Sequence, residues 1–383
     1  MSLDTYYTLG RSGLRVSRLA LGTMNFGTEW GWGCDSRAAR AIFDAYVGAG
    51  GNFIDTADVY TNGTSEQWLG GFIADAGCRD RLVLSTKFTK NMDQGDPNAG
   101  GNGRKNILRA VDASLRRLRT DYIDLYVLHQ WDVLTPVEEV IRTLDDLVRA
   151  GKVRYVGLSD VPAWYAAVAQ TLAEERGLER VCSLQMQYSL LERNVEHEFV
   201  PLCLAKGMSL TAWSPLGGGL LTGKYRRTGS GIEGAGRLDV MQAQSRAAKR
   251  PMSGRSSALE PLAQLNDRSF AILAELESVA QEIGRPVAEV ALQWVASRAA
   301  VGALIIGASS VAQLESNIRS LHCAIPEPLL ASLDAVSRQE PPFPYYFFGG
   351  DWQRRIRGGR AVWSKPPGYF DDGLEAAGNP RAA

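Results

Sequence analysis

The sequence lacks the features that mark several classes of protein. Its 383 residues carry no net charge, because 42 lysines and arginines match 42 aspartates and glutamates, and this argues against a dedicated nucleic-acid binder. Its five cysteines are scattered, odd in number and without CxxC spacing, which argues against a disulfide framework or a zinc site and favours reduced thiols in a cytoplasmic protein. The N-terminus has no apolar signal core, and no uncharged apolar run reaches the roughly 18 residues of a membrane span, so we expect no membrane segment.

Short apolar runs alternate with segments of helical character along most of the chain. A turn at Gly10–Gly13 between two short strands predicts an N-terminal hairpin. We expect helices from Ser36, which can cap the first of them, from Ser65 and from about Arg104, and then over 136–150, 162–175, 194–206, 268–283, 286–298 and 311–320. The strands expected between them cover 18–21, 52–55, 82–87, 123–128, 153–157, 182–186, 209–213 and 303–306.

Eight strands that alternate with helices predict a TIM (β/α)8 barrel, because helical crossovers join parallel strands. The competing fold is an open doubly wound sheet. It would be favoured by a Gly-x-Gly-x-x-Gly turn after the first strand, and the sequence has none there. In the barrel, all the strand-end loops would lie on one face.

We expect one domain over 1–383, with the barrel at about 14–325. A long loop after the seventh strand, 216–267, is rich in Gly, Ser, Arg and Ala, and loops of this length are usually functional or disordered. The C-terminal tail, 340–383, carries many aromatic residues without strand or helix periodicity. Because disordered tails seldom carry so many aromatics, we interpret it as an ordered flap across the barrel mouth.

Four polar residues stand at or just after the ends of the second, third and fourth strands. Asp55 ends one apolar run and Tyr60 follows on its loop, while Lys87 and His129 end the next two. Each residue alone is compatible with a cap, a loop aromatic or a solvated rim position. Because the barrel brings successive strand ends together, we expect the four to converge into one site.

Together these residues could deliver a proton to a carbonyl oxygen. A free tyrosine has a pKa of about 10, which is too high for efficient transfer near neutrality. A lysine ammonium about 4 Å away contributes roughly 4 kcal/mol at an effective dielectric constant of about 20, and therefore favours the phenolate of Tyr60. Asp55 would keep Lys87 charged and oriented, and His129 would position the substrate oxygen. These roles suit reduction of an aldehyde or ketone by an external hydride donor.

The chain resembles the aldo-keto reductases, including their bacterial and potassium-channel β-subunit branch, from about Leu21 to Asn317. The resemblance implies a barrel that binds NADP(H) across the strand-end face, with Asp55, Tyr60, Lys87 and His129 as the catalytic tetrad. The matching motifs are Leu21-Gly-Thr-Met24, Phe53-Ile-Asp-Thr-Ala-Asp-Val-Tyr60, Ser85-Thr-Lys87, Asp124-Leu-Tyr-Val-Leu-His129, Lys152-Val-Arg-Tyr-Val-Gly-Leu-Ser159, Gln185-Met-Gln-Tyr-Ser-Leu-Leu191, Trp213-Ser-Pro-Leu216, Leu221-Thr-Gly-Lys-Tyr225 and Gly307-Ala-Ser-Ser310.

The resemblance also implies the cofactor contacts. Trp213 would stack on the nicotinamide ring, and Ser159 and Gln185 would hold its carboxamide. The glycines after Leu216 permit a close approach of the backbone to a phosphate. The other implied contacts are Gly22, Thr23, Met24 and Asp55 at the nicotinamide ribose, Ser214, Pro215, Leu216, Gly217, Gly218 and Lys224 along the pyrophosphate, and Gly307, Ser309, Gln313 and Asn317 around the adenosine.

The sequence departs from the family pattern at the cofactor. Asp160 stands where Asn usually follows the serine of Gly-Leu-Ser, so it can accept a hydrogen bond from the carboxamide but cannot donate one. Ser309 and Ser316 stand where Arg or Lys and Glu are common. A 2′-phosphate favours a basic partner, and we expect Arg237, in the long loop, to provide it. NAD(H) is not excluded as the cofactor.

Two other functions share this pattern. A cofactor-sensing regulatory protein of the channel β-subunit kind has a similar adenosine segment, although the sequence shows no dedicated docking segment. A sugar or natural-product ketoreductase would share the chemistry and differ in substrate. Trp30 and Trp32, with Tyr60 and His129, predict a partly apolar substrate pocket. We expect no metal and a small-molecule carbonyl substrate as partner, and the sequence leaves a homo-oligomer open.

Overall fold

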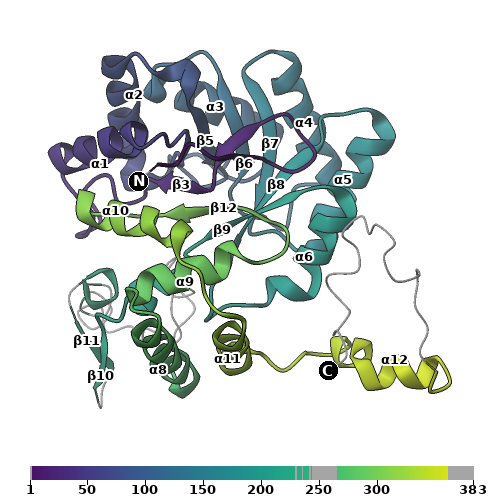
Figure 1. The fold of residues 1–383 in the computed structure, drawn as a ribbon. Helices are drawn as coiled ribbons and strands as arrows, with labels where there is room; N and C mark the ends of the chain where they lie inside the picture. The colour runs from purple at the N-terminus through teal and green to yellow at the C-terminus, as the bar shows by residue number, and fades with distance from the viewer. Residues whose placement is uncertain (1, 229–230, 235, 241–242, 244–264, 361–383) are drawn as a thin grey trace.

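A computed structural model describes residues 2–228, 231–234, 236–240, 243 and 265–360. Eight parallel strands form a closed barrel in the order β12-β3-β4-β5-β6-β7-β8-β9 (Figure 1). This confirms the predicted (β/α)8 barrel. The strands are β3 Leu19–Gly22, β4 Phe53–Asp55, β5 Val83–Phe88, β6 Ile123–Leu128, β7 Val153–Ser159, β8 Val181–Gln187, β9 Ser209–Trp213 and β12 Val301–Ile306.

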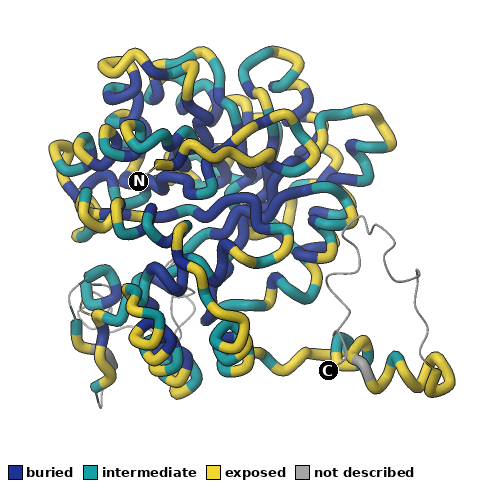
Figure 2. Tube along the Cα trace, in the orientation of Figure 1, coloured by how far each residue is buried: buried dark blue, intermediate teal, exposed yellow. Residues whose placement is uncertain are grey.

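Helices surround the barrel, and their outer faces are exposed (Figure 2). The last of them, α12 (Gly350–Ile356), lies apart from the barrel (Figure 1). Asp35, not Ser36, caps the first helix, because its carboxylate accepts a hydrogen bond from the Ala38 amide at 2.8 Å. The helices are α1 Ser36–Gly48, α2 Thr64–Ala76, α3 Arg104–Leu118, α4 Val137–Arg149, α5 Ala163–Arg176, α6 Val195–Lys206, α8 Asp267–Glu282, α9 Val287–Ala296, α10 Val311–Arg319, α11 Glu327–Ser337 and α12 Gly350–Ile356. Among the described residues, none of them is long and apolar enough to cross a membrane.

The predicted N-terminal hairpin closes one end of the barrel. It consists of β1 Tyr6–Thr8 and β2 Arg15–Ser17, and it inserts the fully buried Leu9 among side chains of the barrel interior. Gly10 has φ +60°, and a Cβ there would lie 2.4 Å from the Cys182 carbonyl oxygen, so this turn requires glycine. The hairpin packs on the N-terminal ends of the strands, for example through a hydrogen bond from the Gly10 amide to Ser209 Oγ at 2.7 Å. The opposite, C-terminal end of the barrel is therefore its mouth.

Strand register aligns polar residues at this mouth. Asp55 pairs with Gly22 on one neighbouring strand and with Ser85 on the other. Ser159 pairs with Gln185. Because the strands are parallel and in register, residues far apart in sequence form one ring at the barrel end.

The long loop after β9 contains a 3-10 segment, Gly217–Thr222, and a small hairpin of β10 Arg226–Thr228 and β11 Gly231–Glu233. Figure 1 shows this hairpin at the lower left, beside α8. The rest of the predicted loop falls mostly outside the described residues.

Helix α11, which was not predicted, precedes the tail and packs beside α8 (Figure 1). Tyr345, in the 3-10 turn that follows, donates a hydrogen bond to Glu198 and stacks on His197 of α6, with ring centroids 5.0 Å apart. Phe343 and Phe348 remain exposed. The predicted flap thus contacts the outer helix α6 through Tyr345. Residues 361–383 of the tail lie outside the described residues.

Candidate active site

A buried ion pair holds the centre of the mouth. Lys87 Nζ at the end of β5 donates hydrogen bonds to Asp55 Oδ2 at 2.6 Å, to the Thr56 carbonyl at 2.7 Å and to Tyr60 Oη at 3.2 Å. An ammonium group has three donors, so Lys87 is fully satisfied. The side chains of Lys87 and Asp55 are 0% and 2% exposed, which shields their attraction from water.

Asp55 is fixed from two further sides. Its Oδ1 accepts hydrogen bonds from Gln185 Nε2 at 2.9 Å and from Ser85 Oγ at 3.3 Å. Sequence reasoning missed the role of Ser85. Ser85 and Lys87 are two residues apart on one strand and so point to the same inward face. This two-residue spacing in the sequence was the signal that could have identified Ser85 as a neighbour of Asp55.

His129 completes the convergence that the sequence predicted. Its ring lies 5.9 Å from the Tyr60 ring, edge to face, and its amide bonds to the Phe88 carbonyl at 3.1 Å, which ties the ends of β5 and β6 together. His129 Nδ1 is buried and has no hydrogen-bond partner among the described residues. Such an atom next to an accessible phenol is suited to a ligand oxygen.

The electrostatic environment sets the protonation of the site. Burial raises the pKa of Tyr60 above its ordinary value, and this outweighs the lowering effect of Lys87. Burial and the charges of Lys87 and Lys90 hold the pKa of His129 well below its usual range. Burial alone would lower the pKa of Lys87, but Asp55 and Tyr60 raise it above its ordinary value. At neutral pH the site therefore holds a neutral phenol, a neutral imidazole and a charged ammonium.

Aromatic residues line the rim next to Tyr60. Trp30 packs edge-on against Tyr60 with centroids 6.4 Å apart and lies 5.4 Å from Trp32. The guanidinium of Arg237 stands over the Trp32 ring at 5.3 Å. The structure thus brings Trp30 and Trp32 to the tetrad. It places Arg237 at this rim, against Trp32, whereas Ser309 lies on the loop after β12 and Gln313 in the first turn of α10.

The residues expected at the nicotinamide lie at neighbouring strand ends. Gly22 ends β3 and pairs with Asp55, and Thr23 and Met24 follow it. Trp213 Nε1, at the end of β9, donates to Asp160 Oδ1 at 3.0 Å. Asp160 keeps an exposed surface, yet desolvation of its carboxyl by the surrounding protein raises its pKa to about 6, and the Trp213 hydrogen bond partly offsets this shift.

A glycine turn and two cations follow β9 along the chain. Gly217 and Gly218 have φ of 56° and 67°, and the Gly218 amide bonds to Ser214 Oγ at 3.0 Å. Burial and the neighbouring charge of Arg237 lower the pKa of Lys224, and burial lowers the pKa of Arg237. Among the described residues, neither cation has a carboxylate within ion-pair distance. Unpaired cations beside a glycine turn fit the charge and the close backbone approach of a pyrophosphate.

The residues expected at the adenosine form a polar cluster at the start of α10. The amide and hydroxyl of Ser309 bond to Gln313 Oε1 at 2.9 and 3.0 Å, and Asn317 Nδ2 bonds to the Gly307 carbonyl at 3.4 Å. Gly307 and Ser309 are exposed and available to a ligand. Ser316 points elsewhere, because its hydroxyl donates to Glu289 at 3.1 Å.

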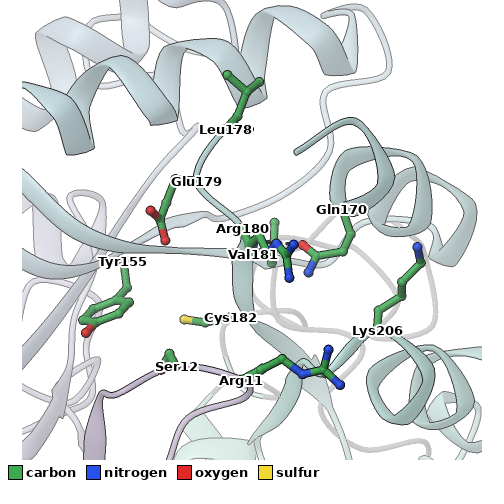
Figure 3. A pocket seen from close by; sticks show the side chains of 11 residues that line it. Arg11, Ser12, Tyr155, Gln170, Leu178, Glu179, Arg180, Val181, Cys182 and Lys206 are labelled. Carbon is green, nitrogen blue, oxygen red and sulfur yellow. Dashed lines mark hydrogen bonds between the residues drawn. The ribbon is translucent and has the colours of Figure 1, made fainter. Parts of the chain in front are cut away.

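One cavity belongs to a different place. It has a volume of about 260 Å³ and is lined by Arg11, Tyr155, Cys182 and Lys206, among others (Figure 3). These residues stand beside the hairpin turn and the start of β8, at the end of the barrel opposite the tetrad. This cavity is therefore not the candidate active site.

The protein is therefore a closed (β/α)8 barrel whose strand ends bring together a buried lysine–carboxylate pair, a phenol and an imidazole. Residues 18–338 match the model of the aldo/keto reductase family. The chain belongs to this family and is an oxidoreductase.

Relatives support this assignment over nearly the whole chain. A norsolorinic acid reductase of Emericella nidulans is 34% identical over 363 residues, covering 92% of this chain and 87% of the relative. An uncharacterized oxidoreductase of Bacillus subtilis is 36% identical, covering 86% and 95%. An aryl-alcohol dehydrogenase of Pestalotiopsis microspora is 32% identical, covering 88% and 83%.

Proposed function

We propose that the protein is an NADP(H)-dependent carbonyl reductase in which Tyr60 is the general acid. The observation that carries this proposal is the chain of contacts from Asp55 through Lys87 to Tyr60, 2.6 and 3.2 Å long. The arrangement gives a protonated phenol a permanent positive neighbour, so the charge that develops on Tyr60 as it gives up its proton is stabilised at once.

The two aromatic rings of the site define where the substrate oxygen would lie. Tyr60 and His129 meet edge to face at 5.9 Å, so an oxygen above their contact would reach the Tyr60 hydroxyl and the buried side of the imidazole. The depressed pKa of His129 keeps its ring neutral. A neutral ring positions a carbonyl without competing with Tyr60 for the role of acid.

The residues expected at the cofactor have side chains suited to bind it. When bound, NADP(H) would supply the hydride. Trp213 would hold the nicotinamide ring, Ser159 and Gln185 its carboxamide, and Lys224 the pyrophosphate. Gln185 already bonds to Asp55, so it links the cofactor position to the tetrad. Arg237 remains our candidate for the 2′-phosphate, although its place over Trp32 means that it would have to turn away from the rim. The test compares the preference for NADPH over NADH in Arg237→Ala and in the unaltered protein. If the preference is the same in both, Arg237 does not bind the 2′-phosphate.

The substrate we propose is an aromatic aldehyde or ketone. Trp30 and Trp32 provide flat apolar surface beside Tyr60. Relatives named norsolorinic acid reductase and aryl-alcohol dehydrogenase are consistent with this class. The five cysteines are unpaired in the structure, which supports a reducing compartment such as the cytoplasm.

The test is NADPH oxidation against a panel of aromatic and aliphatic aldehydes, ketones and keto-sugars, with the alcohol product quantified. We expect alcohol to form in step with NADPH loss, fastest for aromatic carbonyls. If NADPH binds tightly and no carbonyl in the panel is reduced, the reductase proposal fails and a cofactor-sensing role replaces it.

A further inference from the structure

Lys90 is a second lysine at the mouth that the tetrad does not use. It follows β5 by two residues, and its Nζ donates a hydrogen bond to the side-chain oxygen of Gln130, the residue after His129. Gln130 is exposed at the mouth, and its carbonyl is held by Asn102 Nδ2 at 2.9 Å. Asn102 also binds Thr89 at 2.7 Å. This network places the Lys90 ammonium beside His129 in a defined position.

The charge of Lys90 is not neutralised. Its side chain is half-buried, and it has no carboxylate within ion-pair distance among the described residues. Two acids act on it from further away: Asp160, at the adjoining strand end, and the buried Asp58. An ammonium has three donors, and the structure gives Lys90 one neutral acceptor. A surface lysine normally projects into water, so a half-buried, unpaired one beside a catalytic site is available for an anion.

The other side of Tyr60 is aromatic. Ring contacts run from Trp32 to Trp30, then to Tyr60 and to His129. Trp32 Nε1 is buried without a hydrogen-bond partner among the described residues. A flat ligand with its carbonyl at Tyr60 would contact this wall on one side, and a substituent directed past His129 on the other side would reach Lys90.

We infer that the substrate is an aromatic carbonyl compound that carries an acidic group, a carboxylate or an ionised phenol, and that Lys90 binds this anion. This inference rests on the proposed carbonyl reduction, which it narrows to a chemical class. Lys90 is then a specificity residue. Its ammonium selects the charged substrate, whereas the tetrad performs the proton transfer on charged and neutral substrates alike.

The experiment compares two aldehydes that differ only in charge, para-formylbenzoate and its methyl ester. Two quantities are measured for each: kcat/KM with NADPH, and Kd from quenching of tryptophan fluorescence without cofactor. The variants are Lys90→Met, which keeps the length and removes the charge, and Lys90→Arg, which keeps the charge. The control is Lys105→Met, which removes the charge of an exposed lysine near the start of α3. The meta isomers of both compounds are measured in parallel, because they change the distance between the aldehyde and the carboxylate.

We expect the protein to prefer the carboxylate, and Lys90→Met to reduce that preference about tenfold in both quantities, as the loss of roughly 1.4 kcal/mol would do. Lys90→Arg should retain most of it and Lys105→Met all of it. The inference is overturned if Lys90→Met leaves the preference unchanged, if both substrates weaken equally, or if arginine fails to restore it. Should no aldehyde turn over, the proposed reduction fails, and the Kd preference still decides the role of Lys90.

Discussion

Trp213 Nε1 and Asp160 Oδ1 are hydrogen-bonded at 3.0 Å, so the indole expected to face the nicotinamide is held by a carboxylate where the family usually has an amide. The amide of an asparagine could accept this bond equally well and would carry no charge. Asp160 therefore adds a titratable negative charge beside Trp213, where we propose that an anionic cofactor binds.

Replacing this carboxylate should strengthen cofactor binding in a pH-dependent way. The pKa of Asp160 is raised to about 6, so its charge is mostly absent below that pH and present above it. We expect Asp160→Asn to bind NADPH about three- to tenfold more tightly than the unaltered protein at about pH 7.5, and equally at about pH 5. Fluorescence titration of both proteins at each pH measures this, and the comparison cancels titration of the 2′-phosphate itself. An equal ratio at both values would show that the charge of Asp160 does not face the cofactor.

Removing Lys87 should destabilise the fold as well as abolish activity. Lys87→Met leaves Asp55 buried without its cation, and breaking a buried pair in this way costs about 3–5 kcal/mol. The double variant Asp55→Asn/Lys87→Met removes both charges and should recover a large part of that loss. Urea unfolding midpoints of the single and double variants report the difference. A double variant less stable than Lys87→Met would mean that the pair is not coupled as the geometry indicates.

Gly10→Ala should destabilise the protein without altering its chemistry. The alanine would need φ +60° and would place Cβ 2.4 Å from the Cys182 carbonyl, so we expect a loss of about 2 kcal/mol or more. Gly13→Ala, in the same turn, is the matched control, because a Cβ there meets nothing within 4 Å. Thermal unfolding compares the two. Because the N-terminal hairpin lies opposite the mouth, kcat of the folded Gly10→Ala protein should be unchanged. A large change in kcat would mean that the hairpin affects the active site.

Asp58 should make stability depend on pH. It is buried, its Oδ1 has no hydrogen-bond partner among the described residues, and burial raises its pKa to about 8. The folded state thus binds this proton more tightly than the unfolded chain, so stability falls as pH rises from about 4 to about 8, by at most about 1.4 kcal/mol per unit. Asp58→Asn should flatten this slope and be the more stable protein at about pH 8. Exposed Asp121→Asn should leave the slope unchanged, and a parallel slope in Asp58→Asn would contradict the assignment.

The convergence of the four tetrad side chains could be predicted from the sequence. Each of them stands at the end of an apolar strand or on the loop after it, and in a parallel barrel all these strand ends lie at one face. It could not supply the sign of the Tyr60 pKa shift. From the sequence, Lys87 was expected to favour the phenolate, but in the fold burial outweighs that attraction. Asp35 and Ser36 are adjacent cap residues, and only the backbone geometry selects Asp35. The position of Lys90 could not be predicted from the sequence, because it depends on a hydrogen bond to Gln130, which is 40 residues away.

Segments outside the repeat were harder to predict than the barrel. Helix α11 carries Leu329, Leu330, Leu333 and Val336 at helical spacing, a signal that could have found it. It packs on α8, and its Asp334 also joins Arg298 at 3.0 Å and Arg193 at 3.3 Å. The aromatic tail carries no periodicity, so nothing in it specified the contact with α6. Arg237 was chosen for its charge alone, and its position over Trp32 is a tertiary contact that no local pattern encodes.

The most direct test of the account is Tyr60→Phe, which removes one oxygen and keeps the ring against Trp30 and His129. Wild type and variant are compared for NADPH Kd and for kcat/KM on an aromatic aldehyde. The account predicts an unchanged Kd and a loss of about 10²–10⁴-fold in kcat/KM, the contribution of a positioned general acid. Equal turnover by the two proteins would contradict it, because the proton would then come from a group other than Tyr60.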